Sequence, residues 1–384
     1  MVKIPDGLDV WVLAGQSNMQ GCGALVGVLE QDERVFSFTS AGKWEVACEP
    51  LHRLWESFTP VHQLFMRAGY PESAGKTDEE MARIEDETRV GGSGLGISFA
   101  KTLADALGKP IGIIPAAHGG TSLEQWNQNK KDQGGSSLYG AMLERIKLAG
   151  GNVKGILWYQ GESDANENDA VNYQERIISW IEAARADTGI LDLPVIVVQL
   201  GRFVYPDQSI AHWWDVVREA LRTLPDVCPN TACVSANDLG LADAIHIDTP
   251  GLIRLGRRMA QAALRMEQKL PAGPDVVRVE KCKADQPHIG ALKVICKGVT
   301  GKWNPEHHIA GFELFDGEGN PHQTRFVIVA DRDKDDPTSI RVTLTEPLVD
   351  NNARLGYGLG LNPYCNAIDD SDMPLNSFLP MTIE

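Results

Sequence analysis

The sequence lacks long apolar runs, and none approaches the roughly 18 residues that a transmembrane helix needs. Cysteine is sparse: seven residues are dispersed without a CxxC pair, which predicts mostly small buried side chains and leaves at least one thiol free. Basic residues are also few, since 36 Lys and Arg face 52 Asp and Glu, a formal net charge of −16. Such a chain repels nucleic acid and anionic membranes, and no basic run offsets this.

The first ten residues, MVKIPDGLDV, lack the apolar core of a secretory signal. We therefore expect a protein that stays in the cytoplasm, or an exported one whose leader has been removed. The sequence does not separate these two locations, and it does not indicate an oligomeric state.

Between residues 8 and 268, apolar runs alternate with segments of helical periodicity. We expect strands at 8–14, 111–117, 155–160, 195–200 and 231–236, and helices at 97–108, 137–149, 170–189, 213–224 and 250–268. This alternation is typical of an α/β fold with a five-stranded parallel sheet between two layers of helices. Two long irregular stretches, 36–92 and 118–136, interrupt the pattern, and we expect them to shape a binding site.

After residue 270 the pattern changes to short β-rich runs separated by turn signals such as DGEGN. We predict a catalytic-type α/β domain over residues 1–270 and a small antiparallel β domain over residues 271–384. The second domain offers no residues that we can assign to chemistry, so packing against the first domain is its expected role.

Candidate functional residues follow four of the predicted strands. They stand at the carboxyl ends of the strands, where an open parallel sheet collects its functional groups. These residues are Ser17 after the first strand, Gly119 and Gly120 after the second, Gln160 and Glu162 after the third, and Asp243 and His246 after the fifth.

Serine, histidine and aspartate together can form an activated nucleophile, and Ser17, His246 and Asp243 are the candidates. A serine hydroxyl attacks an ester only when a base takes its proton, and His246 is the candidate base. Asp243, three residues earlier, is the candidate that holds the imidazole in the correct tautomer. Asp238 and Asp248 are alternatives for this orienting role.

Four ordered blocks, GQSNMQG, HGGTSLEQW, LWYQGESD and DAIH, resemble the SGNH hydrolases, in particular the sialate O-acetylesterase and acetylxylan esterase branch. The segments WEVACEPLH and LGYGLGLNPYCNAIDDSDMPLNSF resemble the same branch, so the likeness covers most of the chain. The resemblance implies a flavodoxin-like SGNH fold and a catalytic triad of Ser17, Asp243 and His246. It also implies deacetylation of O-acetylated sugars, either sialic acid or a xylan-type polysaccharide.

The resemblance further implies an oxyanion hole made by Ser17, Gly119, Gly120 and Gln160. The third block departs from the wider superfamily, which has Gly-Asn-Asp there. Gln160 is therefore the expected donor, because an ionised Glu162 cannot donate a hydrogen bond. Expected contacts to substrate are Gln16, His118, Glu162 and Trp126. No metal or organic cofactor is expected.

Several alternatives stay open. Trp126, Trp44 and Trp55 in the long stretches either stack on sugars or form a packed loop core. His307 and His308 suggest a metal only weakly, since adjacent side chains point apart. Glu162 and Asp164 are a possible glycosidase pair. A carbohydrate-binding module on an inactive esterase fold is the rival function, and a docking role for the β domain is compatible with either.

Overall fold

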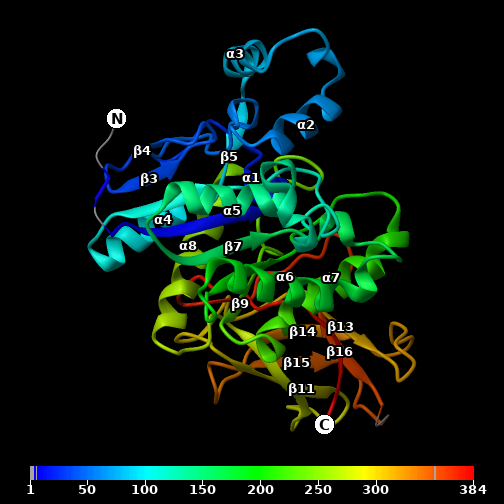
Figure 1. The fold of residues 1–384 in the computed structure, drawn as a ribbon. Helices are drawn as coiled ribbons and strands as arrows, with labels where there is room; N and C mark the ends of the chain where they lie inside the picture. The colour runs from blue at the N-terminus through cyan, green and yellow to red at the C-terminus, as the bar shows by residue number, and fades with distance from the viewer. Residues whose placement is uncertain (1–3, 6, 350–351) are drawn as a thin grey trace.

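The structure is a computed structural model that describes residues 4–5, 7–349 and 352–384. Figure 1 shows a central sheet between helices, with the β-rich C-terminal part of the chain packed beside it. Buried side chains form one large core in the α/β part and a second core in the C-terminal part. Of the helices in these ranges, none is both long enough and apolar enough to cross a bilayer.

The main sheet has seven strands among the described residues, in the order β4-β3-β6-β1-β7-β8-β9. Neighbouring strands are parallel except for β3 and β4. The bounds are β1 (Asp9–Gly15), β3 (Val35–Phe38), β4 (Trp44–Val46), β6 (Ile111–Pro115), β7 (Asn152–Tyr159), β8 (Val195–Gln199) and β9 (Thr231–Ser235).

The five predicted strands are β1, β6, β7, β8 and β9, and their arrangement matches the flavodoxin-like order. The predicted α/β class is therefore confirmed. The sheet is larger than predicted because β3 and β4 extend it beyond β6. These strands have only four and three residues, and a run that short gives almost no periodicity in the sequence.

The predicted helices are α4 (Gly96–Leu107), α5 (Leu138–Ala149), α6 (Tyr173–Thr188), α7 (Ala211–Val227) and α8 (Thr249–Glu267). Local chemistry sets their ends. The Asp248 side chain accepts a hydrogen bond from the Gly251 amide at 2.8 Å and caps the start of α8. Gly108 and Gly189 end α4 and α6 in the left-handed conformation.

Two tryptophans show that the helices cover both faces of the sheet. Trp11 of β1 contacts Phe99 of α4 with ring centroids 5.0 Å apart. Trp158 of β7 contacts Trp180 of α6 at 4.3 Å. Trp158 lies opposite Ala14 in the β1–β7 register. Ala14 is three residues from Trp11, and side chains alternate along a strand, so the two tryptophans point to opposite faces.

The stretch 36–92 also carries its own elements, at the top of Figure 1. They are η1 (Leu54–Glu56), α2 (Pro60–Gly69), η2 (Pro71–Ser73), α3 (Asp78–Thr88) and β5 (Gly91–Ser93), which pairs with β2 (Gly23–Ala24). A small core of Leu54, Trp55, Met66 and Met81 holds α2 and α3 together. In the stretch 118–136, η3 (Gln128–Ser136) leads into α5. Short helical turns elsewhere are α1 (Ser17–Gln20), η4 (Glu162–Asp164), η5 (Ala170–Asn172) and η6 (Gln208–Ile210).

The C-terminal part consists of antiparallel strands in small sheets. One sheet is formed by β10 (Asp275–Lys281), β11 (Gly290–Lys297), β15 (Ile340–Leu344) and β14 (Val327–Arg332), and another by β13 (Phe312–Phe315), β16 (Arg354–Tyr357) and β18 (Phe378–Thr382). A short pair joins β12 (Trp303–Asn304) and β17 (Ile368–Asp369). The division at residue 270 stays a prediction; it falls between α8 and β10.

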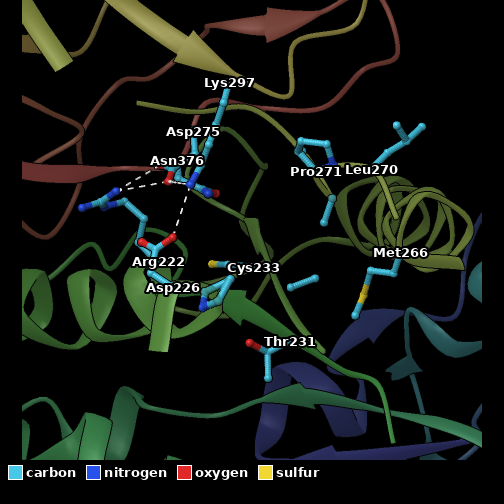
Figure 2. A pocket seen from close by; sticks show the side chains of 14 residues that line it. Arg222, Asp226, Thr231, Cys233, Met266, Leu270, Pro271, Asp275, Lys297 and Asn376 are labelled. Atoms are coloured by element: carbon cyan, nitrogen blue, oxygen red, sulfur yellow. Dashed lines mark hydrogen bonds and ion pairs between the residues drawn. The ribbon is translucent and has the colours of Figure 1, made fainter. Parts of the chain in front are cut away.

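The two parts meet at a cavity of about 280 Å³, near the amino end of β9. Figure 2 shows Arg222, Asp226, Asp275 and Lys297 on one side of it and Met266, Leu270 and Pro271 on the other. The charged side chains pair with one another, because Arg222 contacts Asp275 at 3.2 Å and Lys297 contacts Asp226 at 3.3 Å. This cavity therefore lies at the opposite end of the strands from the predicted reactive residues.

Candidate active site

Ser17 stands at the carboxyl end of β1, beside the point where the strand order reverses between β1 and β7. The chain turns sharply there. Gly15 has a φ of +131°, and a Cβ on it would collide with the backbone of Tyr159. The Gln16 amide then donates to the Tyr159 carbonyl at 2.8 Å. Glycine is thus required for the strand to end abruptly and to present Ser17 as the first residue of α1.

The structure brings Ser17, His246 and Asp243 into one hydrogen-bonded chain. His246 Nε2 lies 3.0 Å from Ser17 Oγ, and His246 Nδ1 lies 2.7 Å from Asp243 Oδ2. The other carboxylate oxygen of Asp243 accepts hydrogen bonds from the amides of Ile245 and His246, both at 2.8 Å. The imidazole is therefore held with one nitrogen directed at the serine hydroxyl.

The alternative aspartates have other partners. Asp238 forms a two-pronged ion pair with Arg258 at 2.7 Å on each side. Asp248 caps α8. Neither is bonded to His246 in the described structure, so geometry favours Asp243 as the orienting residue.

Cys22 also lies beside the imidazole, and sequence reasoning gave it no role. Its Sγ donates to the Ser17 carbonyl at 3.4 Å. The interaction with the Cys22 side chain is the largest cause that raises the pKa of His246 to about 9, with Asp243 adding to the shift and burial opposing it. For Asp243, burial opposes ionisation, but hydrogen bonds from the Ile245 amide and His246 outweigh it and lower the pKa. The pair thus favours an imidazolium next to a carboxylate.

Asn18 links three of the predicted blocks, although its position in GQSN suggested no role for it. It is 1% exposed. Its Nδ2 donates to Glu162 Oε1 at 3.0 Å, and its Oδ1 accepts from the Ile247 amide at 3.0 Å. A buried amide with both ends satisfied fixes the loop that carries His246 relative to β1.

The glycine block approaches Ser17 closely. A Cβ on Gly119 would lie 3.4 Å from the Ser17 Cβ. The Gly119 amide, however, donates to Gln20 Oε1 at 2.7 Å, so it is already engaged. Gly120 has a φ of +68°, lines the pocket and has open space around it. Both glycines line the pocket, but only Gly119 donates its amide to the Gln20 side chain.

Gln160 does not reach the pocket. It is fully buried, and its Nε2 lies 2.6 Å from Asp164 Oδ2, 3.1 Å from the Thr121 carbonyl and 3.2 Å from the Gln16 side chain. The prediction that Gln160 donates to an oxyanion does not fit this geometry, because its amide is committed to buried acceptors. Instead it anchors the turn that contains Gly120. Spacing along the sequence cannot reveal this difference in depth.

Gln16 and Glu162 both line the pocket, and their contact with substrate stays a prediction. Burial is the main cause that raises the pKa of Glu162. Asp164, its proposed glycosidase partner, is fully buried, accepts from the Leu123 amide at 2.9 Å and does not line the pocket. Asp164 is therefore not accessible as the second carboxyl that the glycosidase alternative needs.

His118 lines the pocket and belongs to a buried histidine pair. Its Nδ1 lies 2.9 Å from Nδ1 of His62 on α2, and the rings stack 5.2 Å apart. Burial lowers the pKa of His118 to about 4, so it is neutral near pH 7. At 2.9 Å one of the two Nδ1 atoms carries a proton and donates a hydrogen bond to the other.

Trp126 is 0% exposed and does not line the pocket, so its predicted contact with substrate is wrong. Its Nε1 donates to Thr121 Oγ1 at 3.0 Å, and its ring packs edge-on against Trp158. Trp55 is also buried, and Trp44 Nε1 donates to the Ala149 carbonyl at 3.0 Å. Of the two readings left open, the packed core is confirmed for Trp126 and Trp55, whereas Trp44 is half-buried on β4 and packs against Phe38.

His307 and His308 lie in the C-terminal part, where His307 is exposed beside Glu306 and Asp331. Among the residues that the structure describes, no group of three or more His, Cys, Asp or Glu side chains is arranged to hold a metal ion. All seven cysteines are unpaired.

The pocket around Ser17 has a volume of about 630 Å³. One flank comes from the stretch 36–92, as expected, with Phe65, Met66 and Tyr70 on the α2 side. The other flank had no signal in the sequence and consists of Phe203, Ile210 and Trp214 on the α7 side. A hydroxyl bonded to an imidazole–carboxylate pair and set in such a pocket can act as a nucleophile on an ester.

The profile of a protein family described as "Carbohydrate esterase, sialic acid-specific acetylesterase" matches residues 7–265. The chain belongs to this family, as its motifs predicted, and membership supports esterase activity on a carbohydrate.

Individual relatives agree with this assignment. A protein of Arabidopsis thaliana named "Probable carbohydrate esterase" is 30% identical over 268 residues, which cover 67% of this chain and 90% of that protein. The sialate O-acetylesterase of Pongo abelii is 29% identical over 184 residues, 42% of this chain but only 32% of the relative. The crystal structure of a carbohydrate acetylesterase from Xanthomonas citri has a TM-score of 0.65 at 23% identity, covering 96% of this chain and 80% of that one, and supports the fold.

Proposed function

We propose that the protein removes acetyl groups from O-acetylated carbohydrates through an acetyl-enzyme on Ser17. Family membership supports the reaction class. The observation that carries the mechanism is the hydrogen-bonded chain from Ser17 through His246 to Asp243.

In the first half-reaction, Ser17 Oγ attacks the acetyl carbonyl carbon while His246 Nε2 takes the hydroxyl proton. The tetrahedral intermediate collapses by breaking the bond to the sugar oxygen, which receives the proton from His246. In the second half-reaction, water attacks the acetyl carbonyl and gives a proton to the same nitrogen. Acetate leaves and Ser17 regains its proton. Asp243 stabilises the imidazolium in both halves.

The developing oxyanion needs donors that are already in place, each worth ~3–4 kcal/mol. We assign this role to the backbone amides of Ser17 and Gly120. The Ser17 amide opens α1, where the N–H groups have no partner within the helix. Gln160 acts indirectly: it donates a hydrogen bond to the Thr121 carbonyl and thereby fixes the turn that contains Gly120.

The proposed substrate class is an O-acetylated sialic acid or an acetylated xylan-type polysaccharide. Support for the class comes from the family and its relatives. The pocket is far larger than an acetyl group requires, which agrees with a bulky alcohol as leaving group.

The test is acetate release from two panels, O-acetylated sialic acids and acetylated xylo-oligosaccharides, with a simple aryl acetate as a third substrate. Wild type is compared with Ser17→Ala and with Ser163→Ala. Ser163 lines the same pocket but is not bonded to His246. We expect Ser17→Ala to stay folded and lose all three activities, and Ser163→Ala to keep them.

Retained turnover by Ser17→Ala rejects the nucleophile. Hydrolysis of the aryl acetate alone rejects the substrate class but keeps the mechanism. A folded wild type that hydrolyses nothing supports the rival, a carbohydrate-binding module on an inactive esterase fold.

A further inference from the structure

We infer that Tyr205, backed by Phe203, forms a platform on which the sugar ring of the leaving alcohol stacks. The inference rests on the proposed function and adds to it a specific sugar subsite on the His246 side of the pocket. No motif in the sequence pointed to these two residues.

The position of the leaving group follows from the proton transfer. His246 must reach the sugar oxygen at hydrogen-bond distance to protonate it, so the sugar lies on the side of the pocket next to the imidazole. The carbonyl oxygen lies on the other side, toward the amides of Ser17 and Gly120. Residues adjacent to His246 and away from the glycine block therefore contact the sugar.

Phe203 occupies that side. It lines the pocket together with Ile245 and His246. The next residue, Val204, donates its amide to the Ala244 carbonyl at 2.7 Å, so the segment of Phe203 is bonded directly to the catalytic loop.

Three aromatic rings are stacked in this wall. Trp214, 2% exposed, lies 5.2 Å from Phe203 with an interplanar angle of 30°. Phe203 lies 4.9 Å from Tyr205 with an angle of 14°. Tyr205 is 45% exposed. The stack therefore runs from the core to solvent, and its free face is that of Tyr205, which lies against the pocket-lining Phe203.

The platform is held from both parts of the molecule. The Phe203 amide donates to the Leu361 carbonyl at 2.7 Å, and Arg202 Nη1 donates to Asn362 Oδ1 at 3.3 Å. Trp214 Nε1 donates to the Gly201 carbonyl at 3.1 Å. Residues 361 and 362 follow β16 of the C-terminal part, so this part helps to fix the ring positions. A surface fixed before binding loses little entropy when a sugar stacks on it.

The chemistry of the platform suits a sugar. A pyranose ring presents C–H groups on its faces and hydroxyls at its edge. Flat aromatic side chains bury the faces, while the open mouth leaves the hydroxyls in water. An acetate ester of a small alcohol would not reach the platform, so the contribution of Tyr205 is specific to sugar esters.

The experiment compares kcat/KM for acetylated xylo-oligosaccharides and O-acetylated sialic acid with kcat/KM for ethyl acetate. The variants are Tyr205→Ala, Tyr205→Phe and Phe326→Ala. Phe326 is the control, since it is an exposed aromatic residue, 61% exposed, that does not line the pocket. Because Tyr205 is half exposed, its truncation should not unfold the chain; thermal unfolding checks this.

We expect Tyr205→Ala to lower kcat/KM about tenfold or more for the sugar ester that wild type uses and to leave ethyl acetate unchanged. Tyr205→Phe should retain the preference, and Phe326→Ala should not alter it. Equal losses on both kinds of ester, no loss on either, or a sugar-specific loss in Phe326→Ala would each overturn the platform. Failure of wild type to deacetylate any sugar ester rejects the proposed substrate class, and the platform with it.

Discussion

Asn18 Oδ1 accepts a hydrogen bond from the Ile247 amide at 3.0 Å, which ties the segment of the serine to the loop of the histidine across 229 residues of sequence. Its Nδ2 bonds Glu162 on a third segment. The separation between Ser17 Oγ and His246 Nε2 thus depends on one buried amide side chain.

Removing the Asn18 amide should disturb the alignment of Ser17 with His246 more than it weakens substrate binding. We expect Asn18→Ala to lower kcat about 10- to 100-fold with little change in KM, because small misplacements of reacting groups are costly. It should also lose about 1–3 kcal/mol of unfolding free energy by leaving buried partners unsatisfied. Asn237→Ala is the control: Asn237 is equally buried and bonds Ser377 at 2.8 Å, away from the pocket. It should lose stability but keep kcat. An unchanged kcat in Asn18→Ala would contradict the positioning role.

The orienting role of Asp243 is tested by Asp243→Asn. An asparagine favours the wrong imidazole tautomer, so we expect kcat to fall by up to about 10⁴-fold. Asp248→Asn controls for charge loss nearby and should cost at most about 1 kcal/mol as a weakened helix cap, without loss of activity. Steady-state kinetics of the two variants decide the matter. Near-normal turnover by Asp243→Asn would show that another group orients His246.

The pH dependence should report the contact between Cys22 and His246. The base must be neutral to accept the Ser17 proton, and its pKa is raised to about 9, first by Cys22 and then by Asp243. Activity should therefore rise with pH, about tenfold per unit in kcat/KM, and level off near pH 9. Cys22→Ala should move this rise to lower pH. Cys48→Ala, which alters a thiol outside the pocket, should leave it in place. Identical profiles for wild type and Cys22→Ala would remove Cys22 from the account.

The turn before the serine should tolerate no side chain. Gly15→Ala places a Cβ against the Tyr159 backbone at a φ of +131°, and we expect a loss of more than about 2 kcal/mol in unfolding free energy. Gly69→Ala, at a helical position with open space, should be neutral or stabilising by up to about 1 kcal/mol. Urea unfolding of both variants measures the contrast. A mild effect of Gly15→Ala would mean that the turn relaxes.

Much of this site could be predicted because its parts follow buried strands. The apolar runs that end at Gly15, Pro115 and Tyr159 are continuous, which identifies them as internal strands, and parallel strands bring their carboxyl ends together. The order of the four blocks then indicated which residues would meet, and Ser17, Asp243 and His246 do meet.

The sequence did not predict how deeply individual side chains are buried or which distant residues they contact. Gln160 and Gln16 stand at comparable strand ends, but only Gln16 reaches the pocket, because Gln160 turns toward Asp164. Trp126 looked like a loop aromatic and is a core residue, since the stretch around it packs on β7 and α6. Phe203 and Tyr205 follow β8 without any motif, and their importance depends on a loop of the C-terminal part more than 150 residues away.

The most direct test of the central claim is to find the acetyl group on the enzyme. Wild type is quenched with acid during turnover of an aryl acetate, digested and analysed by peptide mass mapping. The account predicts one acetyl group on Ser17, absent from Ser17→Ala. An acetyl group on Cys22, which also lies beside His246, or full turnover with no acetylated peptide would contradict it.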